Sequence, residues 1–423
     1  MSLNLRAGLI QVCLIFLFAL ALPACHKDTP SPAISKPLDL PANSPQVITA
    51  GNTFAINIFR TMQQSDPESS NTLISPLSIY TALSMAYNGA AGATRDSMTQ
   101  TLALTGVQTA LLNMVSKALI EQMPHEDNKV QLSIANSLWY DNNRVTPNTG
   151  FTDTVGRDYQ AVIQSLDFSS SSSVNTINSW VSQHTSNKIP TIINSLSAYD
   201  LMVLVNAVYF NGAWKQAFKT SDTHDATFYH TDGSTTNVPF MNQTTTLRIY
   251  SGPAFKMVEL PYGTGNAFNM YALLPVNTQQ SLNSFAASLD NSALTQAFFN
   301  LDSVRVGLSL PKWEYSYEIL DMTDPLSRLG MGLAFSPGAA DLTNMFPPSA
   351  GAYISRVIHK TYIKVNEAGT EAAAATGVVV TGLTAFPPAI QSLRLDHPFV
   401  YLITEKQTGA ILFMGKLNDP GKN

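Results

Sequence analysis

The sequence predicts a mixed α+β fold, on the basis of two observations. Apolar residues recur at helical spacing in the first third of the chain, whereas short runs of β-branched, leucine and aromatic residues fill the middle and the end. Helices that come first and strands that come later are typical of an α+β domain. No further linker-like stretch interrupts the chain after residue 46, so we predict one large domain over residues 47–423.

The predicted helices lie near the start of that domain. The segment 50–64 places Phe54, Ile58, Phe59 and Met62 on one helical face. A second helix is predicted after Ser75, because Pro76 suits a first helical position and an apolar pattern follows it. The predicted strands are 201–210, 255–263, 269–276, 304–313 and the two arms of a hairpin within 398–417, with Gly409 at its turn.

The first 25 residues have the character of an export signal. Arg6 precedes an apolar run over about residues 9–22, which is short for a membrane span. The run ends in LPAC, which resembles a bacterial lipobox with a less usual proline, and the cysteine of such a motif is lipidated. We predict a signal peptide over 1–24 and a lipid anchor at Cys25, with an uncleaved anchor as the alternative. The expected location is the bacterial cell envelope, at a periplasmic or surface-facing membrane leaflet, or the secreted fraction.

A tether and an absence of thiols follow from the same region. Residues 25–46 contain five prolines and little apolar pattern, which indicates an extended tether. The chain has two cysteines, Cys13 within the predicted signal peptide and Cys25 at the lipid site. The mature domain therefore has no thiol for a disulfide, a zinc cluster or a cysteine nucleophile.

The composition and the known motifs exclude several functions. A net charge of −5 gives no reason to expect a nucleic-acid partner. The chain contains no G-x-S-x-G elbow and no glycine-rich phosphate loop. HEDNK at His125 lacks the second histidine of a zinc motif, and His224 and His230 would lie about 20 Å apart along a strand. We therefore expect no metal and no cofactor, although a Ser-His-Asp triad assembled by the fold stays open.

One stretch near the C-terminus needs its own explanation. After Glu371 the chain has seventeen residues without a charge, ending in Pro387 and Pro388. The alanine-rich TEAAAATG favours a helix, whereas Val378 to Thr381 favour a strand. The residues alone leave an ordinary buried helix and an exposed loop both open.

Six fragments in order resemble the serpin family, the large serine-protease inhibitors, over essentially all of residues 50–420. They are NTLISPLSIYTALSMAYNGAAGAT, INSWVSQHTSNKI, LVNAVYFNGAWKQAF, LSLPKWEYSYEILDMTDPLSRLGM, VIHKTYIKVNEAGTEAAAAT and DHPFVYLITEKQTGAILFMGKL. The resemblance implies a metastable serpin fold, with N-terminal helices packed on large mixed sheets and an exposed reactive-centre loop over about 367–391. A serine protease would cleave this loop as bait, form a covalent acyl complex, and be trapped when the loop inserts into the large sheet. The resemblance implies an inhibitor that works as a monomer and is not an enzyme.

The same resemblance assigns roles to the residues of this loop. The hinge comprises Glu367, Gly369, Thr370, Glu371, Ala372, Ala373, Ala374 and Ala375. Gly369 gives the hinge conformational freedom, and in an inserted strand alternate residues would share the buried face. These residues are Thr370, Ala372, Ala374, Thr376, Val378 and Val380, and none carries a charge.

The family's spacing also places the reactive bond and a polar cluster. The scissile residue commonly stands seventeenth from the hinge glutamate, which gives Leu383–Thr384, with Thr381 and Phe386 as alternatives. Leucine there suits chymotrypsin-like or elastase-like proteases. Serpins have a polar cluster, called the shutter, beneath the strands that open, and it matches Ser75, Ser78, Asn206 and His359. The family's tryptophan at the point where the loop first enters the sheet matches Trp214. The alternative for each of these residues is an ordinary core residue whose polar groups are hydrogen-bonded. The alternatives for the function of the whole chain are a non-inhibitory serpin and an envelope enzyme.

Overall fold

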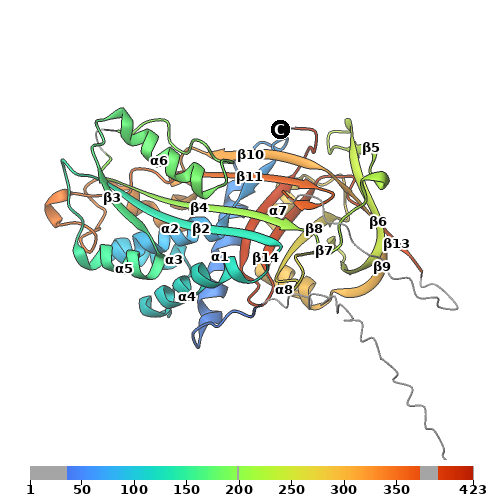
Figure 1. Ribbon diagram of the computed structural model, residues 1–423, viewed down its shortest axis with the longest axis horizontal. Helices are drawn as coiled ribbons and strands as arrows, with labels where there is room; N and C mark the ends of the chain where they lie inside the picture. Colours follow the sequence, from blue (N-terminus) through green and yellow to red (C-terminus); the bar gives the residue numbers. More distant parts are fainter. Residues whose placement is uncertain (1–35, 198–199, 372–388, 423) are drawn as a thin grey trace, which may run out of the picture. The chain divides into compact units, whose positions relative to one another are not determined.

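A computed structural model describes residues 36–197, 200–371 and 389–422 of the chain. All of these belong to one compact unit (Figure 1). The predicted signal peptide, Cys25, Ala372 to Ala375 and the predicted reactive bond Leu383–Thr384 lie outside the described residues.

The larger of two sheets has nine strands. Its order is β1-β15-β14-β8-β7-β6-β9-β13, and β5 pairs with β6 beside this path. The bounds are β1 (Thr72–Ile74), β5 (His224–Tyr229), β6 (Thr235–Ser251), β7 (Phe255–Tyr262), β8 (Phe268–Pro275), β9 (Asp302–Pro311), β13 (Gln391–Arg394), β14 (Phe399–Glu405) and β15 (Ile411–Leu417). The predicted strands around 255, 269 and 304 and the predicted C-terminal hairpin are confirmed as β7, β8, β9 and β14–β15.

The second sheet has six strands in the order β10-β11-β12-β4-β2-β3. Only the β2–β3 pair is parallel among these described neighbours. The bounds are β2 (Val130–Asp141), β3 (Val162–Leu166), β4 (Met202–Ala213), β10 (Trp313–Ile319), β11 (His359–Asn366) and β12 (Gly369–Thr370).

Helices cover both faces of the six-stranded sheet (Figure 1). On β4, Val208 and Phe210 face the main apolar core, which α1 and α2 share, whereas Val205 and Ala207 face α6 and a smaller apolar cluster. This alternation follows from the two-residue period of a strand. The helices are α1 (Ser44–Gln63), α2 (Pro76–Gly89), α3 (Gly92–Thr101), α4 (Thr109–Gln122), α5 (Thr149–Tyr159), α6 (Ser171–His184), α7 (Leu282–Ser288), α8 (Asn291–Phe299) and α9 (Thr323–Leu326).

Local sequence explains where the key elements begin and turn. The side chain of Ser75 accepts a hydrogen bond from the backbone N–H of Ser78 and caps α2, and Pro76 occupies the first helical turn as expected. In the β14–β15 turn, the Glu405 carboxylate accepts from the N–H groups of Gln407 and Thr408, and Gly409 adopts a φ of 73°. A glycine suits that left-handed position because it has no Cβ to clash.

The packed domain begins earlier than the predicted boundary at residue 47. Helix α1 starts at Ser44, and Leu38 is only 5% exposed. The Gln407 side chain accepts from Leu38 N and donates to Leu38 O, each at 2.8 Å. The Gln122 side chain makes the same pair of bonds with Asp39, at 2.7 and 2.8 Å. The C-terminal part of the predicted tether, residues 25–46, thus contacts the domain at Leu38 and Asp39. Nothing in the sequence indicated this, because long-range glutamine contacts leave no local sequence pattern.

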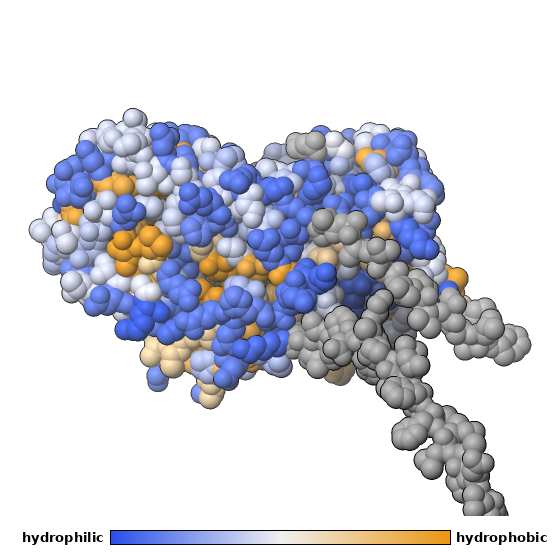
Figure 2. All heavy atoms as spheres, in the orientation of Figure 1, coloured by the Kyte–Doolittle hydropathy of each residue, from blue (hydrophilic) through white to orange (hydrophobic). Residues whose placement is uncertain are grey.

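None of the described helices is both long and apolar enough to cross a bilayer. Figure 2 shows mostly hydrophilic residues on the visible face, with hydrophobic residues gathered in small areas. Among the described residues, no group of three or more histidine, cysteine, aspartate or glutamate side chains could hold a metal ion.

Candidate functional site

The site centres on a two-residue strand between β4 and β11. Strand β12 pairs antiparallel with both neighbours, so that Thr370 lies opposite Val365 on one side and Gly212 on the other. Gly369 has a φ of 154°, a conformation that other residues rarely adopt. The start of the predicted hinge therefore already occupies a place in the sheet, whereas the sequence placed it in an exposed loop.

Thr370 is buried against the aromatic side chain of Tyr262, which in turn stacks on Trp214. Its side chain is 2% exposed, and its hydroxyl shares a hydrogen bond with the Tyr262 hydroxyl. Tyr262 stacks on Trp214 with ring centroids 4.4 Å apart, and burial raises the pKa of Tyr262 well above its usual value. The indole N–H of Trp214 donates to Asn366 O at 2.9 Å. The predicted Trp214 thus lies at the hinge, and Tyr262 is a partner that sequence reasoning missed.

Glu367 fixes the base of the hinge. Its carboxylate lies 3.0 Å from Lys312 Nζ and accepts a 2.9 Å hydrogen bond from the Thr223 hydroxyl. Burial would raise the pKa of Glu367, but hydrogen bonds from the backbone, Lys312 and Thr223 outweigh it and hold the pKa below its usual value. The carboxylate is therefore ionised at neutral pH and paired on both sides.

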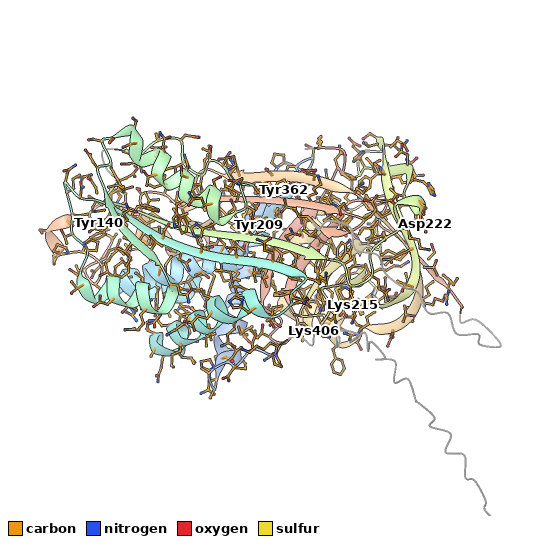
Figure 3. The ribbon with its side chains drawn as sticks, in the orientation of Figure 1. Tyr140, Tyr209, Lys215, Asp222, Tyr362 and Lys406 are labelled. Carbon is orange, nitrogen blue, oxygen red and sulfur yellow. The ribbon has the colours of Figure 1, made fainter. Side chains whose placement is uncertain are left out.

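Glu371 leaves the strand and is held by a cation. Its φ is 62°, in the left-handed region, while its N–H still donates to Lys364 O at 2.8 Å. Its carboxylate forms an ion pair with Lys188, whose ammonium lies 4.9 Å from the centroid of the Tyr362 ring. We call Glu371, Lys188 and Tyr362 the hinge clasp. Figure 3 labels Tyr362 on β11 and Tyr209 on β4, the strands that flank it.

The predicted shutter residues separate into two groups. Ser75 N–H donates to His359 Nε2 at 3.0 Å, and the Ser75 hydroxyl donates to Leu412 O at 2.8 Å. Ser78 joins through its bond to Ser75 Oγ at 3.3 Å. Burial lowers the pKa of His359 to about 3, so the ring is neutral and Nε2 is free to accept.

Asn206 belongs to the second group and bonds elsewhere. Its side chain donates to Asn136 Oδ1 at 2.6 Å, and Asn136 donates to Tyr159 O at 2.7 Å. None of the described hydrogen bonds joins Asn206 to Ser75, Ser78 or His359. Asn136 is the hydrogen-bond partner of Asn206 that sequence reasoning missed, and the shared shutter role of the four residues stays a prediction. The signal for Asn136 was a polar amide within an apolar strand, directly opposite Asn206.

The register nevertheless brings Asn206 and His359 to the same level of the sheet. Strands β4 and β11 are both antiparallel to β12, so they are parallel to each other. Gly212 and Val365 flank Thr370, and six residues back along each strand stand Asn206 and His359. The Asn206 group on β4 and the His359 group on β11 thus lie at the same height along the two strands, on opposite sides of the path that β12 would take if it were longer.

Comparison with known proteins identifies the family. The family model described as serpin (serine protease inhibitor) matches residues 49–420. Serpin-ZXA of rice (Oryza sativa subsp. japonica) is 35% identical over 83% of this chain and 90% of its own length. Serpin-Z2A of wheat (Triticum aestivum) is 36% identical, over 84% and 92% respectively. The chain belongs to the serpin family, whose members are generally protease inhibitors.

Solved structures agree with this fold and include different functional states. The thermophilic serpin tengpin in its native state matches with a TM-score of 0.82 at 31% identity, covering 91% of this chain and 97% of that one. Tengpin in its latent state matches with a TM-score of 0.75. A thyroxine-binding globulin complex with thyroxine matches with a TM-score of 0.78 at 26% identity, covering 89% and 99%. The predicted serpin fold is thereby confirmed.

Proposed function

We propose that this serpin is a suicide-substrate inhibitor of extracellular serine proteases. Cleavage of the loop forms an acyl-enzyme, and insertion of the loop between β4 and β11 traps it as a covalent complex with one inhibitor monomer. The observation that supports this most is the placement of Gly369 and Thr370 between β4 and β11, paired with both. The greater likeness to native than to latent tengpin is consistent with a loop that has not yet inserted.

The register predicts where each loop residue would go on insertion. Continuing the β12 ladder sets position 372 between Phe210 and Ile363, position 374 between Val208 and Thr361, and position 376 between Asn206 and His359. The flanking side chains at the first two levels are at most 8% exposed. Small or uncharged residues at 372, 374 and 376 suit this buried face, where an unpaired charge would be strongly unfavourable.

The energy of insertion is sufficient for trapping. Slowing the hydrolysis of an acyl-enzyme by about a millionfold corresponds to about 8 kcal/mol. Adding about ten residues to the sheet forms about ten hydrogen bonds, each contributing about 1 kcal/mol net. Insertion can therefore supply the required free energy when it is faster than deacylation.

The target class follows from the residue at the reactive bond. We propose Leu383–Thr384 as the bait, with Thr381 and Phe386 as alternatives, and a chymotrypsin-like or elastase-like protease as the partner. No lysine or arginine occurs between Gly369 and Gln391, which disfavours trypsin-like targets.

Incubation with chymotrypsin, pancreatic elastase and subtilisin in turn tests the proposal. We expect a complex that survives denaturing electrophoresis. We also expect a released C-terminal peptide whose mass shows that it begins at Thr384. Cleavage by all three without any complex would contradict inhibition of these protease classes. Turnover of a substrate by the chain itself would instead indicate an enzyme.

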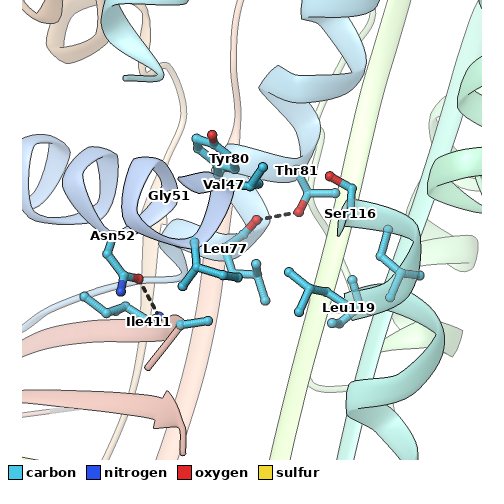
Figure 4. Close-up of a pocket in the computed structure, with 13 residues that line it drawn as sticks. Val47, Gly51, Asn52, Leu77, Tyr80, Thr81, Ser116, Leu119 and Ile411 are labelled. Carbon is cyan, nitrogen blue, oxygen red and sulfur yellow. Dashed lines mark hydrogen bonds between the residues drawn. The ribbon is translucent and has the colours of Figure 1, made fainter. Parts of the chain in front are cut away.

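A second candidate is a non-inhibitory serpin that carries a ligand. A small apolar cavity of about 40 Å³ lies between α1, α2 and α4 (Figure 4). Its lining includes Val47, Leu77, Leu119 and Ile411, and the Asn52 side chain bonds to Ile411 N at 3.0 Å. The structural similarity to a thyroxine-binding globulin complex, a serpin-fold protein with a bound ligand, supports this second candidate. A ligand carrier would be cleaved in its loop without trapping the protease.

We further propose that the chain is anchored to the envelope through lipidated Cys25. The support is the LPAC ending of the apolar N-terminal run. Two or more acyl chains would hold it firmly, since each buried CH₂ contributes about 0.8 kcal/mol. Incorporation of labelled palmitate should occur in the wild-type chain and be lost in Cys25→Ala. Labelling that persists in this variant would contradict the assignment.

A further inference from the structure

A second pocket lies directly beside the hinge. It is formed by the loop after β4 and by strands β6, β7 and β9, and it holds about 710 Å³ of empty space, part of it open to solvent. Trp214 and Phe218 form its aromatic wall, with ring centroids 6.5 Å apart and planes at 74°, and Leu260 and Pro261 extend the apolar surface. One side of the pocket is therefore shaped for a flat apolar group.

The opposite character comes from two cations. Arg248 Nη1 lies 3.1 Å from the buried carboxylate of Glu259, which also accepts a 3.0 Å bond from the Tyr271 hydroxyl. The charge of Glu259 is thus satisfied within the pocket wall. Lys215 is exposed, and no carboxylate among the described residues pairs with it. The pocket keeps one uncompensated positive charge, at the point where the chain leaves β4 (Figure 3).

Polar groups line the remaining wall. Gln243 and Thr246 come from β6, and Ser303 comes from β9 directly opposite Arg248. These side chains can donate hydrogen bonds but add no charge. An apolar wall, neutral donors and an unpaired ammonium together are complementary to a small organic anion with a flat apolar body.

The wall of this pocket is also part of the hinge. Trp214 contacts the pocket from one side, while its N–H groups donate to Asn366 O and Ala368 O, both at 2.9 Å. Phe218 N–H donates to Glu367 O at 2.9 Å. A ligand that holds Trp214 and Phe218 in place would therefore also hold residues 366–368, the turn that leads into β12 and from which its ladder would continue on insertion.

We propose that this pocket binds a small aromatic carboxylate or a similar organic anion, with Lys215 pairing its charge and Trp214 and Phe218 packing against its ring. Binding holds the turn at residues 366–368 in the position from which the β12 ladder continues, and so speeds loop insertion. The binding site stands independently of the proposed inhibition, whereas the effect on insertion rests on it.

Calorimetric titration of the full chain with 1-naphthoate tests the binding site, and the neutral isostere 1-naphthamide tests the role of charge. Lys215→Glu should weaken naphthoate binding by about tenfold or more, because reversal replaces attraction by repulsion. Lys219→Glu, an exposed change outside the pocket, should leave the affinity within about twofold. Ser303→Asp places a negative charge on the far wall and should also weaken naphthoate without touching Lys215.

These outcomes decide the site regardless of whether a protease is trapped. Naphthamide binding as tightly as naphthoate, or equal naphthoate affinity in Lys215→Glu and Lys219→Glu, would overturn the proposal. No naphthoate binding to the wild-type chain would overturn it as well.

A second measurement tests the link to insertion. With a protease that the chain traps, saturating naphthoate should lower the number of inhibitor molecules consumed per protease trapped, because faster insertion leaves less acyl-enzyme to hydrolyse. Each variant is compared with its own value without ligand, and the fall should disappear in Lys215→Glu. Binding that leaves this ratio unchanged would overturn the hinge effect and leave the binding site intact.

Discussion

The two sheets of this domain differ in how completely their central strands are paired. In the nine-stranded sheet, β14 and β15 are buried at all seven positions each, and β14 pairs with β15 on one side and β8 on the other along its length. In the six-stranded sheet, the described residues join β4 and β11 only through the two-residue β12. Met202, Val203 and Leu204 of β4 remain half-buried. One chain thus builds a sheet whose central strand β14 is paired on both sides and a sheet in which β4 and β11 are joined at two described positions only.

The largest effect should come from closing the six-stranded sheet to new residues. Thr370→Arg replaces a side chain that is 2% exposed with a cation that has no described partner at that level. Because burying an unpaired charge is strongly unfavourable, the variant should be cleaved by the protease without trapping it. Gel analysis of complex and cleaved chain measures this, and Thr220→Arg at an exposed turn is the control. Undiminished trapping by Thr370→Arg would refute the insertion mechanism.

A core substitution in the nine-stranded sheet should separate stability from trapping. Leu402 is 0% exposed in β14, and Leu402→Ala should lower the free energy of unfolding by about 2–5 kcal/mol. The ratio of trapped to cleaved molecules should stay at the wild-type value, since β14 takes no part in strand insertion. Denaturant unfolding and the gel assay measure the two effects, with the half-exposed Met114→Ala as control. A change in that ratio as large as for Thr370→Arg would erase the distinction between the sheets.

Acid should weaken the six-stranded sheet through His359. The folded pKa of His359 is about 3, below the ordinary value of 6.5, so as pH falls the unfolded chain takes up a proton that the folded chain refuses. Between pH 7 and pH 5 this should remove about 2 kcal/mol from the free energy of unfolding. His359→Gln can still accept from Ser75 N–H and should lose this component of the pH dependence. Exposed His224→Gln should keep it, and equal pH profiles for the two variants would contradict the assignment.

The smallest effect should come from the hinge clasp. Lys188→Met removes the ion pair that holds Glu371 outside the strand conformation. Partly exposed ion pairs contribute about 0.2–1 kcal/mol, so loop insertion should accelerate by about 1.4- to fivefold. Rapid-mixing fluorescence with a labelled protease measures the rate, and Lys117→Met, which removes an exposed helical pair, is the control. Slower insertion in Lys188→Met would show that the clasp assists the hinge.

Local patterns were enough to predict most of the fold. Helical spacing found α1 and α2, apolar runs found β4, β7, β8, β9, β14 and β15, and the ordered serpin fragments supplied the architecture. Trp214, Thr370, Ser75 and His359 could be named from the sequence because each lies within a recognisable fragment, and their functional roles stay predictions. The hinge clasp was not predicted, since Lys188 and Glu371 are far apart in sequence and meet only through the loop after α6. The hydrogen-bond partner of Asn206, Asn136, was missed because the family's motif spacing predicts where Asn206 lies along the sheet but not which neighbouring side chain it bonds to.

The glutamine contacts at the N-terminal end have a mechanical consequence. Gln407 and Gln122 each grip one backbone position, Leu38 and Asp39, by a donor and an acceptor bond. A force applied to the chain at residue 36 is therefore resisted by these two pairs of hydrogen bonds before it reaches Ser44, where α1 begins. The force is carried to the β14–β15 turn and to the end of α4, and not directly to β4 or β11. Tension on the N-terminus is thus borne first by these two contacts and not by the strands between which we propose that the loop inserts.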